Sequence, residues 1–205
     1  MPRTFAMALF FAVPAFAQPS IELYSGVNFP YSPFHEVDEF FLKDFWMVGI
    51  NGGINAQFHV ADWLVLSPGF EYSHYPFSHF FQWVSTAERR VQSSSGQSSH
   101  IYRVPFTVRL FDTSKGFVIP YISLGGEYVF ENIGRIHIIW QNQDGTNSVS
   151  DIEGPDRSYW AYSVGIGTVI QISTHIDLDP SLKYHSNTTD RFYMSFNLGV
   201  LYTFE

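Results

Sequence analysis

The chain has 205 residues, a length that fits one domain or at most two small ones. Aromatic residues make up 19% of the sequence and charged residues 15%, below the roughly 25% usual for soluble domains. The net charge of −8 argues against nucleic-acid binding, which needs clustered Lys and Arg, and the absence of cysteine excludes disulfides and thiolate chemistry.

The N-terminal segment has the pattern of a secretory signal peptide. Arg3 supplies a positive charge, residues 5–16 form a short apolar stretch, and residues 15–17 read Ala-Phe-Ala, a small-x-small cleavage site. We therefore predict a signal peptide over residues 1–17, cleaved after Ala17, and a single domain over residues 18–205; a buried N-terminal helix is the alternative. A secreted chain without cysteine fits a Gram-negative envelope better than an extracellular disulfide scaffold.

Through the rest of the chain, apolar residues recur at every second position, which is the period of a β-strand with one apolar and one polar face. No segment has a convincing helical period. Segments of this kind are long enough, at about 3.4 Å per residue, to cross a hydrocarbon layer at a tilt. In chain order, the expected strands cover residues 20–29, 48–60, 63–74, 102–110, 120–130, 162–172, 175–185 and 192–204.

The connections between these strands alternate between short and long. Residues 61–62 and 112–116 are short and contain turn-forming residues, whereas residues 75–98 and 131–157 are long, polar and rich in Ser, Gly, Asn and Asp. Short turns on one side and long loops on the other, with an even strand number, are typical of an outer-membrane barrel. We therefore predict an all-β fold, an eight-stranded antiparallel up-and-down transmembrane β-barrel with short periplasmic turns and long extracellular loops.

The two faces of the expected strands distinguish a membrane barrel from a soluble one. Eight strands leave an interior just wide enough for side chains, so the Gly, Ser, Asn and charged residues belong inside and the apolar rows face lipid. A soluble lipocalin-like carrier would instead keep its apolar face inside, around a ligand. It is the less favoured alternative, because the wholly apolar rows of this chain would make water-exposed patches larger than monomers tolerate.

With this facing, acidic and basic side chains point into the barrel in nearly equal numbers. A narrow interior requires this balance, because an unpaired buried charge costs several kcal/mol. We expect them to plug the barrel, with a minor pore as the alternative. The predicted interior charge network consists of Glu22, Glu71, Arg103, Arg109, Glu127, Asp177, Asp179, Lys183 and Arg191.

Several of these segments resemble the porin-family outer-membrane β-barrel domain, a small barrel of the OmpX/OmpA type found in Bacteroidetes-type bacteria. Residues 63–73 (Trp-Leu-Val-Leu-Ser-Pro-Gly-Phe-Glu-Tyr-Ser) resemble its third strand, residues 101–108 its fourth and residues 120–126 its fifth. The chain departs from the family at its end, where Glu205 follows the aromatic Phe204. The resemblance implies an outer-membrane location, contacts with membrane lipid, lipopolysaccharide and the barrel-assembly machinery, and no shared activity.

One short segment gives an enzymatic lead. His185 and Ser186 faintly resemble the His-x-Ser-Asn motif of the lipid A deacylases. Here the two residues are adjacent, so strand alternation sends them to opposite faces, whereas a base and its nucleophile need to lie about 3 Å apart. We therefore expect no catalytic residues and no enzyme, and keep a deacylase-like activity as the alternative.

Possible metal ligands are scattered along the chain. His74 and His79 share one expected loop, and His35 lies with several acids in another. Loops that converge can hold a cation, but eight histidines spread over the whole sequence do not suggest a built site. We expect no metal and no cofactor.

The first long loops are strongly aromatic, notably residues 29–34, 40–46 and 75–83. The simpler interpretation is an aromatic girdle at the membrane interface with loops packed over the barrel mouth. The other is a contact patch for an extracellular partner, because exposed apolar patches mark contacts. The candidate contact residues are Phe77, Phe80, Phe81 and Trp83. We thus expect a monomeric protein with a structural or surface-interaction role.

Overall fold

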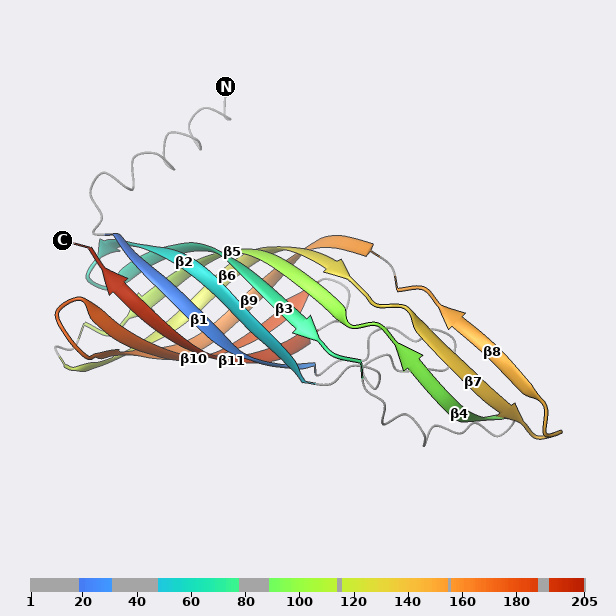
Figure 1. The fold of residues 1–205 in the computed structure, drawn as a ribbon. Coiled ribbons are helices and arrows are strands. Elements are labelled where there is room, and N and C mark those ends of the chain that lie inside the picture. The colour runs from blue at the N-terminus through green and yellow to red at the C-terminus, as the bar shows by residue number, and fades with distance from the viewer. Residues whose placement is uncertain are drawn as a thin grey trace, which may run out of the picture.

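The computed structural model describes residues 19–30, 48–77, 89–113, 116–154, 156–187 and 192–204, which form eleven β-strands (Figure 1). The predicted signal peptide over residues 1–17 lies outside the described residues. In the described part of the chain, no helix is long and apolar enough to cross a membrane.

Eight of the strands form a closed antiparallel barrel in the order β1-β11-β10-β9-β6-β5-β3-β2, with β1 pairing to both β2 and β11. This confirms the predicted eight-stranded fold. The barrel strands are β1 (Pro19–Pro30), β2 (Gly49–Ala61), β3 (Leu64–Tyr75), β5 (Ser99–Phe111), β6 (Val118–Asn132), β9 (Asp156–Gln171), β10 (Ile176–Asn187) and β11 (Phe192–Thr203).

The other three strands form a second sheet in the order β4-β7-β8. They are β4 (Arg89–Gly96), β7 (Ile136–Asn142) and β8 (Asn147–Ile152). Only two or three residues separate β4 from β5, β6 from β7 and β8 from β9, so this sheet continues three barrel strands beyond the barrel mouth (Figure 1). We call it the projecting sheet.

The projecting sheet corrects the expectation that residues 75–98 and 131–157 are loops. Both ranges contain strands, because backbone pairing across the sheet and a buried apolar row on β7 stabilise them although β4 and β8 are mostly polar. The opposite end of the barrel carries the connections β2–β3, β5–β6 and β9–β10 and both ends of the described chain (Figure 1). We call this the short-turn end.

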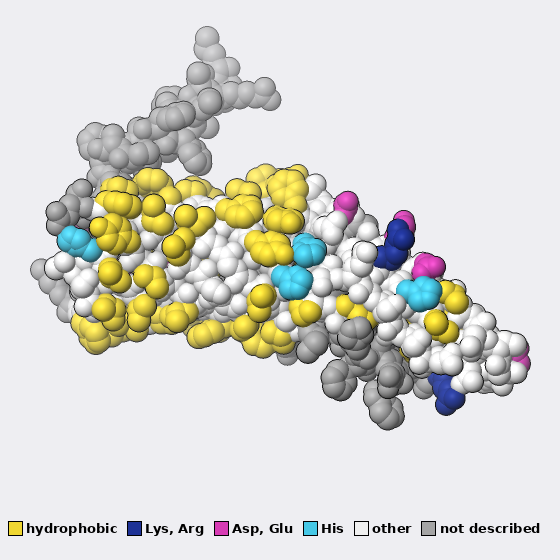
Figure 2. All heavy atoms as spheres, viewed as in Figure 1, with side chains coloured by type: hydrophobic (Ala, Val, Ile, Leu, Met, Phe, Trp, Pro, Cys, Tyr) yellow, Lys and Arg dark blue, Asp and Glu magenta, His cyan; other side chains and the backbone are white. Residues whose placement is uncertain are grey.

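The barrel is apolar outside and polar inside, as the sequence alternation predicts. Along β1, Ser20, Glu22 and Tyr24 are buried, while Ile21 and Leu23 are 37% and 59% exposed. Hydrophobic side chains cover much of the outer wall in Figure 2, and charged side chains gather over the projecting sheet. The hydrophobic surface of this protein therefore faces outward, and its barrel interior holds polar groups.

Glycines make room for large side chains in this narrow interior. A Cβ added at Gly53 would lie 2.4 Å from the ring of Tyr24, and one added at Gly167 would lie 2.4 Å from the ring of Tyr121. Carbon atoms do not approach each other this closely. Each tyrosine ring therefore fits only because the neighbouring strand carries a glycine at that position. The two rings in turn reach the interior carboxylates.

Candidate functional site

The interior near the short-turn end is organised around Arg109 of β5. Its Nη2 lies 2.5 Å from Oε2 of Glu22 on β1, and its Nη1 lies 2.6 Å from Oδ2 of Asp179 on β10. The hydroxyl of Tyr121 donates to Asp179 at 2.7 Å, and the amide of Asn55 donates to Glu22 at 2.7 Å. One guanidinium thus holds two carboxylates from strands on the far side of the interior, while Asn55 shares the Glu22 oxygen with Arg109 and Tyr121 bonds the second oxygen of Asp179.

A second group lies nearer the projecting end and is centred on Arg103 of β5. Its Nη1 lies 2.5 Å from Oε1 of Glu71 and donates to the hydroxyl of Ser73 at 2.6 Å. Tyr24 donates to the other oxygen of Glu71 at 3.0 Å, and the ring of Tyr193 lies 4.4 Å below the guanidinium. The ring supports the cation through its π-face, and the Nε of Arg103 lies 4.0 Å from Oε2 of Glu127 on β6.

The same region contains an arrangement that resembles catalytic chemistry. Nδ1 of His185 lies 2.8 Å from Oε1 of Glu127, and Nε2 lies 3.0 Å from Oγ of Ser195. With Nδ1–H donating to the carboxylate, Nε2 accepts from the serine hydroxyl, which is the order of groups in a Ser-His-acid triad. The ring of Tyr193 stacks on the imidazole at 4.3 Å, and Asn197 donates to Ser195 at 3.3 Å.

These three side chains are too deeply buried to act as an active site. Ser195, His185 and Glu127 are 0%, 1% and 2% exposed, so no carbonyl of a substrate has access to the hydroxyl. The sequence drew attention to Ser186, but the structure pairs His185 with Ser195, which comes from the neighbouring strand β11. This partner has no signal in the sequence near His185. The arrangement acts as a structural bridge across the barrel.

The predicted interior charges can now be placed. Lys183 belongs with the buried set, and its Nζ lies 5.5 Å from the ring centre of Tyr24. Asp177 is half-buried at the short-turn end, and Arg191 lies outside the described residues. The predicted charges that are buried inside the barrel are Glu22, Glu71, Arg103, Arg109, Glu127, Asp179 and Lys183, each 7% exposed or less. Glu131, which the prediction omitted, is buried at 3% exposure in the inward row of β6.

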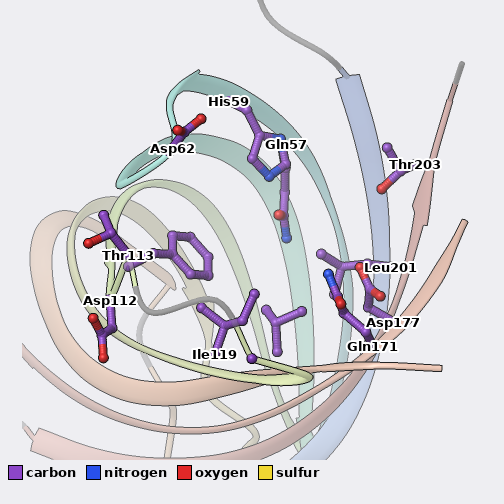
Figure 3. A pocket seen from close by; sticks show the side chains of 13 residues that line it. Gln57, His59, Asp62, Asp112, Thr113, Ile119, Gln171, Asp177, Leu201 and Thr203 are labelled. Carbon is purple, nitrogen blue, oxygen red and sulfur yellow. The ribbon is translucent and has the colours of Figure 1, made fainter. Parts of the chain in front are cut away.

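Below these groups, a cavity of about 630 Å³ opens at the short-turn end (Figure 3). Apolar side chains, among them Val169 and Leu201, line it together with polar ones. Its acidic lining residues are Asp62, Asp112 and Asp177. Within the described parts of the chain, no group of three or more His, Asp or Glu side chains is placed to hold a metal ion. The cavity therefore shows acidic character without a defined ligand site.

The projecting sheet has a core of its own at the barrel mouth. Ile136, Ile138 and Trp140 alternate along β7 with exposed fractions of 1%, 0% and 1%. The indole N–H of Trp140 donates to the hydroxyl of Ser150 on β8 at 3.0 Å. The buried cluster also includes Tyr75, Phe77, Val91, Ile101, Val129 and Ile133, which join the sheet to the barrel rim. The sheet is thereby a packed extension of the barrel.

This core corrects one of the expected contact residues. Phe77 lies inside the cluster at 8% exposure, and a Cβ added at Gly96 would meet its ring at 2.4 Å. Its ring packs against the base of the sheet, so it does not present an exposed surface to a partner. The other candidates, Phe80, Phe81 and Trp83, lie outside the described residues.

The opposite face of the projecting sheet is polar, and Val149 on β8 is 57% exposed on it. Side chains of both signs lie there, so no large patch of one sign forms on the pairs described. Three polar pairs cross this face: Arg90 with Gln141, His137 with Asp151, and Arg135 with Glu153.

The tip of the β7–β8 hairpin is a tight turn. Gly145 has a φ of 82°, in the left-handed region that glycine adopts without strain. The hydroxyl of Thr146 donates to Oδ1 of Asp144 at 2.6 Å, and its backbone N–H donates to the same oxygen at 2.9 Å. These hydrogen bonds hold the pKa of the Asp144 carboxyl below its ordinary value. Local bonding therefore fixes the end of the hairpin.

Comparisons with known proteins agree on the fold. No protein-family model and no curated protein matches the sequence. Neisserial surface protein A matches with a TM-score of 0.53 and 15% identity, over 91% of this chain and 97% of that one. Ail, the attachment invasion locus protein of Yersinia pestis, matches with a TM-score of 0.50 and 15% identity, over 92% of this chain and 99% of that one.

A major outer membrane protein from Thermus thermophilus also matches, with a TM-score of 0.50 and 9% identity, over 91% of this chain and 99% of that one. At these identities the likeness extends to the fold. The chain therefore has the closed-barrel architecture of small outer-membrane proteins, and its function has to be argued from its own residues.

Proposed function

We propose that this protein is an outer-membrane β-barrel with a role in surface interaction, and that the projecting sheet is its contact element. The plugged interior supports this role over a pore, because eight buried charged side chains fill a barrel of only eight strands. The burial of His185 and Ser186, which are 1% and 8% exposed, argues against the deacylase-like alternative.

The outer wall supports insertion into a membrane. Aromatic girdles mark both interfaces of a transmembrane barrel, with an apolar band between them. Exposed aromatic side chains lie towards the projecting end, namely Tyr102, Phe130, Trp160 and Tyr184, and towards the short-turn end, namely Trp63, Phe117, Tyr202 and Phe204. With the short-turn end in the periplasm, the projecting sheet stands outside the cell.

The observation that carries the contact role is the edge of β8. Among the described strands, β8 pairs only with β7. The N–H of Asn142 donates to the carbonyl of Thr146, so strand alternation directs the N–H of Val149 away from β7. An edge of this kind accepts an extended segment of another protein through backbone hydrogen bonds, while alternate side chains provide specificity.

The charge pattern supports a protein strand as the partner over a polyanion. Ail has been solved in complex with the heparin analogue sucrose octasulfate. On the sheet of this protein, Arg135 is matched by Glu153, and Arg90, which bonds the neutral Gln141, is a single cation without an acidic neighbour in the pairs described above. A sulfated ligand needs unmatched positive charge, whereas backbone pairing at an edge strand does not.

The location is tested by gel mobility of the membrane-extracted protein before and after boiling. A closed barrel has no edge to fray, so it resists detergent and migrates compactly until it is heated. We expect a boiling-dependent shift from the outer-membrane fraction. Recovery from soluble periplasm without a shift would contradict the proposal and favour a carrier.

The contact role is tested by panning a phage-displayed library of extended peptides against the folded protein in detergent. Val149→Pro removes the outward N–H and leaves the β7–β8 ladder intact, so we expect the selected peptides to lose binding. Val149→Thr keeps the N–H and should retain binding. Ser150→Pro breaks the ladder and serves as the unfolded-sheet control. Peptides that bind the Val149→Pro variant as well as the wild type would rule out pairing at this edge.

A further inference from the structure

Two histidines face each other on the outer wall near the projecting end. His74 on β3 and His100 on β5 are direct partners in the antiparallel register, and both are half-buried. Their ring centres lie 5.1 Å apart with an angle of 45° between the planes. Histidine side chains gather at this end of the hydrophobic belt in Figure 2. The two imidazoles are therefore neighbours at the edge of the apolar surface.

This spacing matches what two histidines need to share one metal ion. A zinc–nitrogen bond is about 2.0–2.1 Å long, and each ring centre lies about 1.1 Å behind its ligating nitrogen, so tetrahedral coordination places the ring centres roughly 5 Å apart. The observed distance between the rings of His74 and His100 is 5.1 Å. Backbone pairing of the two strands thus sets the chelating distance without any rearrangement of the barrel.

The orientation of one ring is also fixed. Nδ1 of His100 lies 2.7 Å from the hydroxyl of Tyr72. A ligating histidine characteristically bonds its second ring nitrogen to a neighbouring polar group, which fixes the tautomer and directs the other nitrogen to the metal. In the tautomer that carries its proton on Nδ1, His100 donates to the tyrosine oxygen and the lone pair of Nε2 is available to a metal.

The surroundings add no competing cation. On one side of the pair, His74 is the register partner of Ile50 on β2. On the other side, His100 pairs with Asn132 on β6, which in turn pairs with Asp156 on β9. Asn132 donates to Asp156 at 2.7 Å. These described partners include no Lys or Arg, so no fixed positive charge among them opposes a metal ion.

We propose that His74 and His100 bind one divalent transition-metal ion of borderline softness, such as Zn²⁺, Ni²⁺ or Cu²⁺, on the outer wall of the barrel. Imidazole ligands select these ions over Ca²⁺ and Mg²⁺, which prefer oxygen. Two protein ligands leave the other coordination positions to water or to phosphate oxygens of the surrounding membrane. This inference is independent of the contact role of the projecting sheet.

The proposal replaces the sequence-based expectation of no metal site. That expectation placed His74 in a loop with His79, whereas His74 lies on β3 and its partner is 26 positions further along the chain, on the next barrel strand. His79 lies outside the described residues. The pair depends on strand register, which the spacing of histidines in a sequence does not reveal.

The test is Cu²⁺ binding to untagged, refolded protein in detergent, followed by electron paramagnetic resonance. We expect one tightly bound Cu²⁺ with two imidazole nitrogens. Loss of a supporting hydrogen bond alone weakens metal sites by about 10–100-fold, so His74→Ala and His100→Ala should each weaken binding by at least about 100-fold and remove one nitrogen from the spectrum. Heat-dependent gel mobility verifies that each variant is folded.

His137→Ala and His175→Ala are the matched controls, because each removes a histidine from another part of the surface and should leave binding unchanged. A His35→Ala/His79→Ala variant tests the two histidines that the structure does not describe. Cu²⁺ binding that persists in the His74→Ala and His100→Ala variants, or that disappears only without His35 and His79, would overturn the proposal.

Tyr72→Phe tests the positioning role of the tyrosine. It removes the hydroxyl beside His100 and keeps the ring, so both nitrogens should remain in the spectrum while affinity falls by about tenfold. Unchanged affinity would remove Tyr72 from the site and leave the two-histidine proposal to stand on the ligand variants.

Discussion

Arg109 and Glu22 are separated by 87 residues in the chain, yet their side chains lie 2.5 Å apart at the centre of the barrel. Both are 3% exposed or less, and the same guanidinium also contacts Asp179. The contact connects β5 to β1 and β10 through the interior rather than along the wall. This ion pair links strands across the interior, whereas the backbone hydrogen bonds link neighbouring strands around the wall.

Replacement of Arg109 by Met should therefore destabilise the barrel by about 3–5 kcal/mol, because Glu22 and Asp179 stay buried without the guanidinium that pairs with both. Arg135→Met is the control, since Arg135 is 61% exposed in its pair with Glu153 and such pairs contribute about 0–1 kcal/mol. Urea unfolding in lipid vesicles measures both. Equal midpoints for the two variants would show that the interior pairs contribute little.

Gly53→Ala should destabilise the barrel by about 1–3 kcal/mol, because the new Cβ would lie 2.4 Å from the ring of Tyr24 and 2.6 Å from the backbone carbonyl oxygen of Phe70. Gly126→Ala is the matched control: a Cβ there has no atom within 4 Å. The measurement is the temperature at which the compact gel band disappears. A Gly53→Ala band as heat-resistant as that of Gly126→Ala would contradict the packing described for Tyr24.

Trp140→Ala should unfold the projecting sheet without opening the barrel. The indole is 1% exposed, and its loss costs about 3–5 kcal/mol, which is more than a three-stranded sheet with a small core can lose. We expect protease cleavage within residues 136–152 and an unchanged compact barrel on gels. Resistance of that segment to protease would mean that the barrel alone holds the sheet in place.

Ser195→Ala should leave the acylation of lipid A unchanged in cells that express the protein, because the hydroxyl is buried and serves only to satisfy His185. The unfolding free energy should fall by about 1–3 kcal/mol as Nε2 loses its partner. Mass spectrometry of lipid A from wild-type and variant strains measures the first effect. A change in acylation that follows Ser195 would revive the deacylase alternative.

The barrel was predictable because its strands obey a single rule, that apolar and polar residues alternate. Each expected strand, such as residues 192–204, overlaps a barrel strand, here β11. The inward facing of Arg103 and Glu71 follows from the same rule, since each lies in a polar row. Their contact with each other depends on register, which alternation does not specify.

The projecting sheet was missed because its strands obey the rule weakly. β4 contains three consecutive serines, and its pairing with β7 shifts register between Val91 and Ser93. β8 has no buried apolar residue, since Val149 is exposed and Ile152 is only half-buried. Such strands are stabilised by pairing with β7 and by the packing around Trp140, so their own sequences carry little strand pattern. Sequence reasoning also missed the contacts of His185 with Ser195 and of His74 with His100. In each pair the two residues lie on adjacent strands, so only the register brings them together.

The continuity of the projecting sheet with the barrel has a mechanical consequence. Only residues 133–135 separate β7 from β6, and only residues 153–155 separate β8 from β9. A pull on the hairpin tip therefore passes along the strands and loads the β6–β9 ladder, which pairs Val118–Asn132 with β9, in shear. Ladders loaded in this direction must break many hydrogen bonds together, so the projecting sheet transmits tension directly into the barrel wall.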